Sequence, residues 1–173
     1  MVVGWARGGR LEALGRASLR GMPLLGAALA MVLLARVPWQ APAVGRILQG
    51  LGYLAALAVL WQNRSHPWAL VILVGLGLNA LVLTLNMGRM PVSDGALARV
   101  THTIDPQAGS ADLDARHFIV GPGTRLSQLG DVVAVGAWGV GVVLSPGDVV
   151  MAIGLAGFVQ REMCAWRPAC GGG

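Results

Sequence analysis

The chain has 173 residues, 55% of them hydrophobic and only 12% charged, whereas soluble domains carry about twice that charged fraction. Thirteen arginines, no lysine and eight acids give a net charge of +5, but no basic cluster is interleaved with aromatic side chains, which argues against nucleic acid binding. The apolar residues occur in blocks that are apolar all round, and this pattern predicts an integral membrane protein.

The first half of the chain predicts a surface helix followed by three membrane spans. Residues 1–20 are rich in arginine, with apolar residues about one turn apart, as in an amphipathic helix on a membrane surface. Apolar runs then predict spans at about 22–38, 47–62 and 68–86. An Ala-x-Ala pattern within Gln40–Ala43 leaves cleavage of the first run by signal peptidase as an alternative.

Two features inside these runs predict contacts between helices. Gly52 and Ala56 are four residues apart, a spacing of small residues that lets helix backbones approach closely. Asn79 lies within the third run, and an amide in hydrocarbon requires a polar partner, so we expect its face to meet another helix.

The second half of the chain predicts a polar segment and a last span. Residues 87–131 contain three prolines and nearly balanced charges, which indicates a loop or a small cap outside the membrane. Residues 132–144 are apolar but too short to cross, so we expect an interfacial or re-entrant hairpin. "SPGD" at Ser145–Asp148 is typical of a helix start, with Ser145 as N-cap and Asp148 completing a capping box, and the last span covers about 146–162.

The arginine distribution predicts the orientation. With four spans and both termini cytoplasmic, seven arginines lie inside and only Arg36 and Arg46 lie in the short outer loop. We therefore expect an all-α protein, a single membrane domain over residues 1–173 with about four spans, in the inner (cytoplasmic) membrane. Its polar segment 87–131 is extracytoplasmic and its C-terminus is cytoplasmic.

Four motifs occur in order along the chain: "GGRL" at Gly8–Leu11, "NMGRMPVS" at Asn86–Ser93, "TRLSQLGD" at Thr124–Asp131 and "SPGD" at Ser145–Asp148. Together they resemble a bacterial family of small multi-pass membrane proteins of unknown function, with NxGRMP, LGD and SxGD motifs. The resemblance implies the architecture and no activity. It also implies an apolar helix before "GGRL", where this chain has only "MVVGWA" ahead of Arg7.

Polar residues near the outer boundary form the candidate site. Arg89 is expected to share a face with Asn86 if the third helix continues for one turn, and to pair with Asp131 or Asp148. The cluster is either a structural clasp between the polar segment and the helix ends or a substrate or ion site. Its six members are Asn86, Arg89, Asp94, His117, Asp131 and Asp148.

No established catalytic or metal motif is present, so we assign no catalytic residue, metal or cofactor. "DLDARH" at Asp112–His117 does not have the spacing of a metal site. Ser93 and Asp94 with His117 or His102 lack the Gly-x-Ser-x-Gly elbow of a serine hydrolase. Cys164 and Cys170 are interpreted as free thiols.

Three functional classes fit this sequence. We favour a non-enzymatic component of the cell envelope or a partner in a membrane complex. The alternatives are a small transporter or permeation accessory, and a membrane-embedded enzyme acting on an envelope substrate. The expected partners are the lipid bilayer and other membrane proteins or a second copy of this chain, with no nucleic acid.

Overall fold

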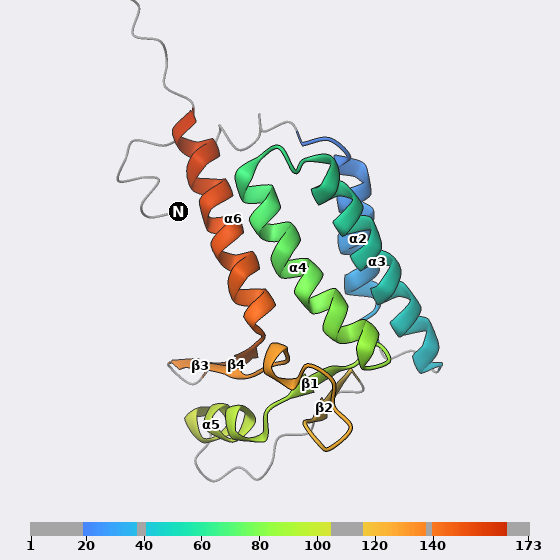
Figure 1. Ribbon diagram of the computed structural model, residues 1–173, viewed down its shortest axis with the longest axis vertical. Coiled ribbons are helices and arrows are strands. Elements are labelled where there is room, and N and C mark those ends of the chain that lie inside the picture. Colours follow the sequence, from blue (N-terminus) through green and yellow to red (C-terminus); the bar gives the residue numbers. More distant parts are fainter. Residues whose placement is uncertain (1–18, 38–40, 105–115, 138–139, 166–173) are drawn as a thin grey trace, which may run out of the picture.

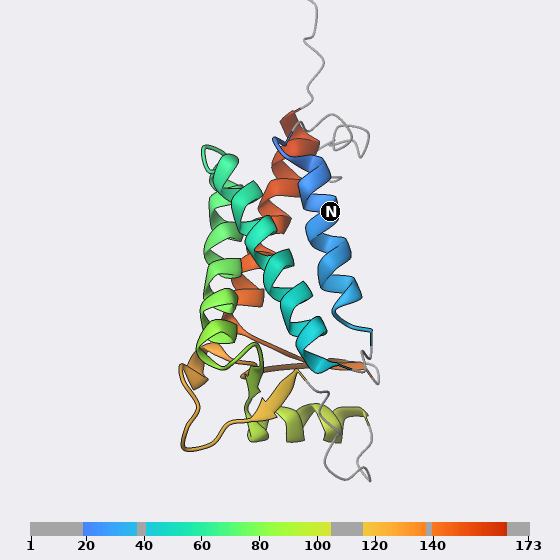
Figure 2. The same ribbon diagram turned by 90° about the vertical axis from the view of Figure 1, so that its right-hand side faces the viewer.

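Four long helices lie side by side, and a small cap covers one end of them in the computed structural model (Figure 1). The structure describes residues 19–37, 41–104, 116–137 and 140–165. The bundle consists of α2 (Met22–Leu34), α3 (Pro42–Gln62), α4 (Pro67–Leu85) and α6 (Pro146–Ala165). Figure 2 shows that the described chain starts and ends at the end of the bundle opposite the cap.

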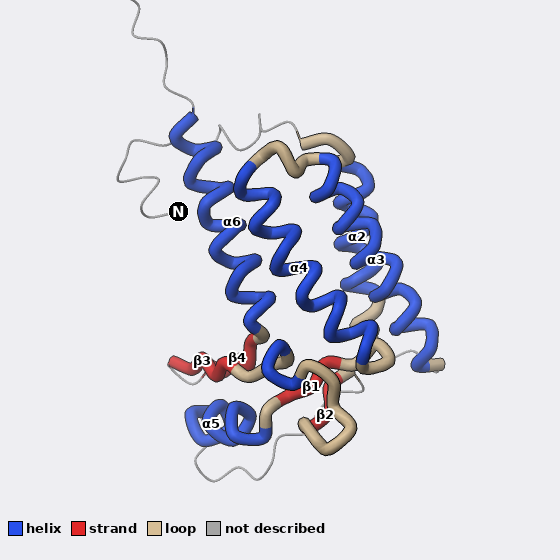
Figure 3. The backbone as a smooth tube through the Cα atoms, in the orientation of Figure 1, coloured by secondary structure: helices blue, strands red, loops and turns tan. Residues whose placement is uncertain are grey.

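The cap contains strands as well as helices (Figure 3). It comprises β1 (Met90–Val92), α5 (Asp94–Ile104), β2 (His117–Ile119), the 3₁₀ helix η2 (Ser127–Leu129), β3 (Val133–Ala137) and β4 (Val140–Leu144). The prediction of an all-α fold is therefore wrong here, although the described chain is mostly helical. Proline at position 91 and the valine-rich, glycine-punctuated segment 132–144 favour extended backbone over helix.

The strands form two small sheets at the base of the bundle. β1 and β2 pair in parallel, with Met90 opposite His117, and Asp131 adds an isolated bridge to Val92. β3 and β4 form an antiparallel hairpin with Val133 opposite Leu144. This hairpin lies between α5 and the end of the bundle (Figure 1).

Proline and glycine determine how the bundle helices start and pack. α3, α4 and α6 each begin on a proline, whose missing N–H costs nothing in the first turn. A Cβ added at Gly52 would lie 2.9 Å from the carbonyl oxygen of Ala28 in α2, so the predicted close packing at Gly52 is confirmed. Gly75 of α4 is equally close to α6, where its Cβ would lie 2.6 Å from the Gly147 carbonyl oxygen.

Two of the four predicted spans have the length and hydropathy of a membrane-crossing helix. They lie in α3, over Ala43–Gln62, and in α4, over Pro67–Leu85. α2 is apolar but has 13 residues, about 20 Å at the helical rise, which is shorter than a bilayer core. α6 has 20 residues, but Gln160, Arg161 and Glu162 make its last turns polar.

α4 ends before the "NMGRMPVSDG" segment of the sequence (residues 86–95). Asn86 is the C-cap, Met87 has a left-handed φ of 57°, and the Gly88 N–H donates to the Leu83 carbonyl at 2.7 Å, as in a Schellman motif. The helix therefore does not continue for a further turn. The expectation that Asn86 and Arg89 share a helix face is wrong.

Candidate functional site

A polar cavity of about 400 Å³ lies where the cap meets the bundle. It is lined by Arg36 just after α2, by the second to fourth turns of α3, by the last turns of α4, by the first turn of α6 and by residues of the cap. The apolar part of its wall comes from Leu83, Met90 and the end of β4. The polar side chains that line it are Arg36, Gln49, Tyr53, Asn79, Arg116, His117, Asp131 and Asp148.

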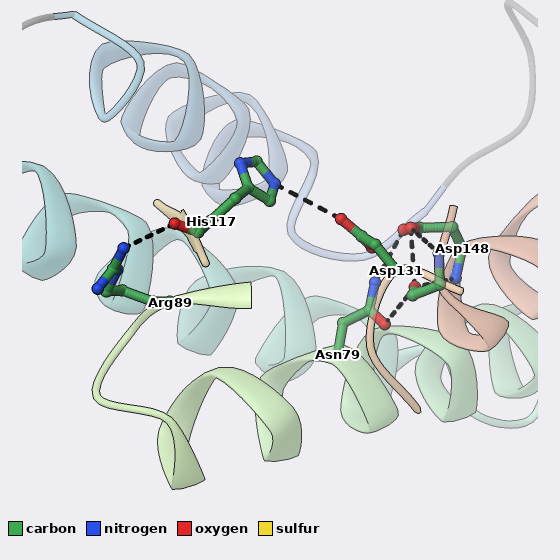
Figure 4. Close-up of polar contacts among 6 residues, drawn as sticks. Asn79, Arg89, His117, Asp131 and Asp148 are labelled. Atoms are coloured by element: carbon green, nitrogen blue, oxygen red, sulfur yellow. Dashed lines mark hydrogen bonds and ion pairs between the residues drawn. The ribbon is translucent and has the colours of Figure 1, made fainter. Parts of the chain in front are cut away.

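One side of the cavity is a hydrogen-bonded clasp between α4 and α6 (Figure 4). The Asp148 N–H donates to Ser145 Oγ at 3.0 Å, and the Ser145 N–H donates to Asp148 Oδ2 at 3.0 Å, which confirms the capping box. Asn79 Nδ2 donates to Asp148 Oδ1 at 2.8 Å. The predicted polar partner of Asn79 is therefore the N-terminus of α6.

Ser145 connects all three members of this clasp. It is fully buried, and its hydroxyl oxygen lies 2.8 Å from Asn79 Oδ1 and 2.7 Å from Asp148 Oδ2. The single hydroxyl proton can be donated to one of these oxygens at a time. Asp148 accepts hydrogen bonds at both carboxylate oxygens, so the clasp stabilises the buried carboxylate without neutralising its charge.

A carboxylate and an imidazole also line the cavity. His117 Nε2 lies 3.5 Å from Asp131 Oδ2, and the two side chains are 32% and 11% exposed (Figure 4). Burial raises the pKa of Asp131 to about 6, an effect that His117 opposes and Asp148 reinforces. The Asp131 backbone is held at both ends, because its N–H donates to Pro91 and its carbonyl accepts from Ser93.

Arg89 does not form the ion pair expected for it. Its guanidinium donates to the His117 carbonyl oxygen at 2.7 Å and lies 5.3 Å from the centre of the Phe118 ring. The reason is the parallel pairing of β1 and β2, which places Arg89 beside the start of β2 instead of over the cavity. Its Nε is buried without a hydrogen-bond partner in the described part of the chain.

The six predicted residues therefore separate into two groups. His117, Asp131 and Asp148 line the cavity, whereas Arg89 supports the backbone of β2. Asn86 exchanges hydrogen bonds with the backbone of Arg125 and so ties the loop before η2 to the end of α4. Asp94 is exposed in the first turn of α5 and lines a separate hollow beside Ser127 and Gln128.

Sequence reasoning missed several cavity residues. Gln49 and Tyr53 belong to an apolar run, but with Arg46 they follow a spacing of three and four residues, which marks one polar stripe along α3. Gln49 Oε1 is buried and has no hydrogen-bond partner in the described structure. Nothing in the sequence next to Arg36 or Arg116 indicated that they line a cavity, because only the fold brings them there.

Within the described residues, no three His, Cys, Asp or Glu side chains are arranged to hold a metal ion. Asp112 and Asp114 of the "DLDARH" segment, the side chain of His102, and Cys170 lie outside the described residues. Cys164 is a half-buried free thiol in α6.

Comparison with known proteins identifies a family and no activity. No curated protein and no solved structure matches the chain. A family of unknown function, DUF5317, matches residues 16–160, a range that includes both bundle and cap and three of the four quoted motifs. The chain therefore belongs to the DUF5317 family of unknown function.

Proposed function

We propose that the protein is a multi-pass protein of the cell membrane, in which α2, α3, α4 and α6 all lie within the bilayer as one domain. Only 17% of the α3 segment and 28% of the α4 segment is buried, whereas the core helix of a soluble protein is mostly buried. α2 packs along α3 and α6 along α4, so a bilayer that contains α3 and α4 also surrounds the other two (Figure 2). Leu54, Ile153 and Leu155, each more than half exposed, then face lipid.

In this arrangement the cap is extracytoplasmic and the C-terminus is cytoplasmic. The support is the arginine count at the two ends of the spans. A single cysteine at Gln128, which is exposed in the cap, is expected to react with a membrane-impermeant maleimide in intact cells, after both native cysteines are replaced by serine. The matched control is Arg161→Cys, exposed at the other end of the bundle, which should react only after permeabilisation. If the Arg161→Cys protein reacts in intact cells and the Gln128→Cys protein reacts only after permeabilisation, the cap is cytoplasmic and the proposed orientation is wrong.

We infer that the protein acts as a non-enzymatic envelope component that binds a polar group in the cavity. The observation that carries this proposal is that Asp131, His117 and Arg36 all line one cavity of about 400 Å³. This volume lies within the usual range of ligand sites, about 300–1,000 Å³. A purely structural role in the clasp explains Asn79, Ser145 and Asp148, because these three side chains form hydrogen bonds with one another. It does not account for His117, Asp131 and Arg36, which also line the cavity.

Native mass spectrometry of the protein purified in mild detergent tests this function. The wild type is expected to carry a bound small molecule that is absent from Asp131→Asn and from His117→Ala. Gln128→Ala, outside the cavity, is the control and should retain the molecule. A cooperative thermal unfolding transition in each variant would show that the variants are folded. Retention of the molecule by folded cavity variants would refute the assignment of this cavity as the binding site.

One observation favours an enzyme as the second candidate. The His117–Asp131 pair faces the cavity, and a buried carboxyl whose pKa is raised to about 6 is suited to acid–base work near neutral pH. In an enzyme, His117→Ala and Asp131→Asn each abolish the cellular phenotype of the protein while its abundance stays normal. If the protein only binds, the phenotype is lost together with the bound molecule, whereas loss of the phenotype while native mass spectrometry still detects the molecule would indicate an enzyme.

A further inference from the structure

An apolar groove of about 210 Å³ adjoins the polar cavity and runs between α3 and α4. The apolar part of its wall includes Gly50, Leu54 and Leu57 from α3 and Ala80 and Leu83 from α4. Gln49, Tyr53 and Leu83 line both the groove and the polar cavity, so the two spaces adjoin at these three side chains. A ligand that fills both must be polar at one end and apolar at the other.

The charges around this junction favour an anionic head. The clasp donates hydrogen bonds to both carboxylate oxygens of Asp148, and Asp131 faces His117, so both cavity carboxylates already have partners. Arg36 lines the cavity and Arg46 lines the groove, and neither makes an ion pair with any described residue. Arginine is suited to phosphate, because its planar guanidinium presents several donors at once.

Gln49 adds an independent indication at the same point. Its side chain lies between Arg46 and Tyr53 on the stripe of α3, where groove and cavity meet. The buried Oε1 atom has no donor from the described chain, and burying an amide without a partner is costly. A hydroxyl group on a bound head would supply this donor.

We propose that the protein binds an anionic glycerophospholipid, with its phosphate head where cavity and groove adjoin, toward Arg36 of the cavity and Arg46 of the groove, and one acyl chain in the groove between α3 and α4. This inference rests on the proposed binding function and specifies its ligand. The ligand comes from the surrounding bilayer, because the groove opens on the lipid-facing side of the bundle, where Leu54 is 66% exposed.

Photo-crosslinking tests the proposal on the full-length protein in nanodiscs. The bilayer is phosphatidylcholine doped with phosphatidylglycerol that carries a diazirine on its acyl chain. We expect adducts on the α3 and α4 segments that line the groove. Phosphatidylcholine with the same diazirine is the headgroup control. Equal labelling of the groove by both lipids would show only contact with bulk lipid and would overturn the proposal.

Gly50→Leu tests whether the chain occupies the groove. Gly50 lines the groove and nothing lies within 4 Å of a Cβ there, so a leucine side chain starts in open space and has a better helix propensity than glycine. Groove adducts should fall about tenfold, because excluding two methylene groups already changes a binding constant by roughly that factor. Gly26→Leu in α2 is the matched control, since Gly26 is equally open and does not line the groove. Unchanged labelling in Gly50→Leu would overturn the proposal.

Two further variants keep the outcome decisive. Ala80→Leu fills the groove from α4 and replaces Gly50→Leu if that variant does not fold. Arg36→Gln with Arg46→Gln should reduce phosphatidylglycerol labelling to the level of the phosphatidylcholine probe. Full competition by glycerophosphate would mean a site for a free anion, which refutes the acyl chain and leaves the proposed function standing. If labelling fails but native mass spectrometry still detects a cavity-dependent molecule, this inference alone is wrong.

Discussion

The clasp between α4 and α6 offers the sharpest test of how the bundle is held at the cap. Asn79→Ala removes the Nδ2 donor that lies 2.8 Å from Asp148 Oδ1, at a position where Asn79 is only 3% exposed. A hydrogen bond to a charged group contributes about 1.5–3 kcal/mol in soluble proteins. Hydrogen bonds between helices in a bilayer contribute less, about 0.6–2 kcal/mol, because the unfolded helices also find partners.

We expect Asn79→Ala to lower the free energy of unfolding by about 2 kcal/mol, because its acceptor is a carboxylate. Denaturation in mixed micelles, followed by circular dichroism, measures this change. A double-mutant cycle with Asp148→Ala should give a coupling energy of about 1–2 kcal/mol. Thr84→Ala is the control, since Thr84 is exposed on α4 and bonds only its own helix. A coupling energy below about 0.5 kcal/mol would refute the assignment of this bond as a clasp.

Two further predictions concern Asp131 and the packing of α2 on α3. The pKa of Asp131 is raised from 3.8 to about 6 in the folded protein. Between these two pH values the folded state therefore binds more protons than the unfolded state. The stability that the Asp131 carboxyl contributes is fully present below pH 3.8 and is lost as the pH rises through 6. Asp131→Asn should therefore flatten the pH dependence of the melting temperature between pH 4 and 6 and stabilise the protein at pH 7; an identical pH profile would contradict the burial of this carboxyl. Gly52→Ala places a Cβ 2.9 Å from the Ala28 carbonyl oxygen and should destabilise the protein by about 1–3 kcal/mol in the same unfolding assay. Gly50→Ala, in open space on the same helix, should be neutral or stabilising, and equal effects of the two substitutions would argue against close contact of α2 and α3.

Features that depend on neighbouring residues were predictable. The capping box at Ser145–Asp148 needs only a serine, a proline and an acid at fixed spacing, and it forms as expected. The demand of Asn79 for a partner follows from burying an amide in an apolar run. Strands β1 and β2 were not predicted, because each has only three residues and 24 residues separate them in the chain. Such short segments carry too little periodicity to indicate a strand.

The amino-acid sequence by itself determined the apolar helices, the prolines at which they begin and the polar segment between them. It also determined that more arginines flank the cytoplasmic ends of the predicted spans than lie in the short outer loop. These properties follow from hydropathy, local backbone geometry and charge, which each residue carries wherever it lies. The tertiary structure decided which polar groups meet. It placed Arg89 on a backbone carbonyl, paired His117 with Asp131, and joined Gln49 and Tyr53 to both cavity and groove. These contacts join residues far apart in the chain, so only the packing of α3, α4 and the cap could create them.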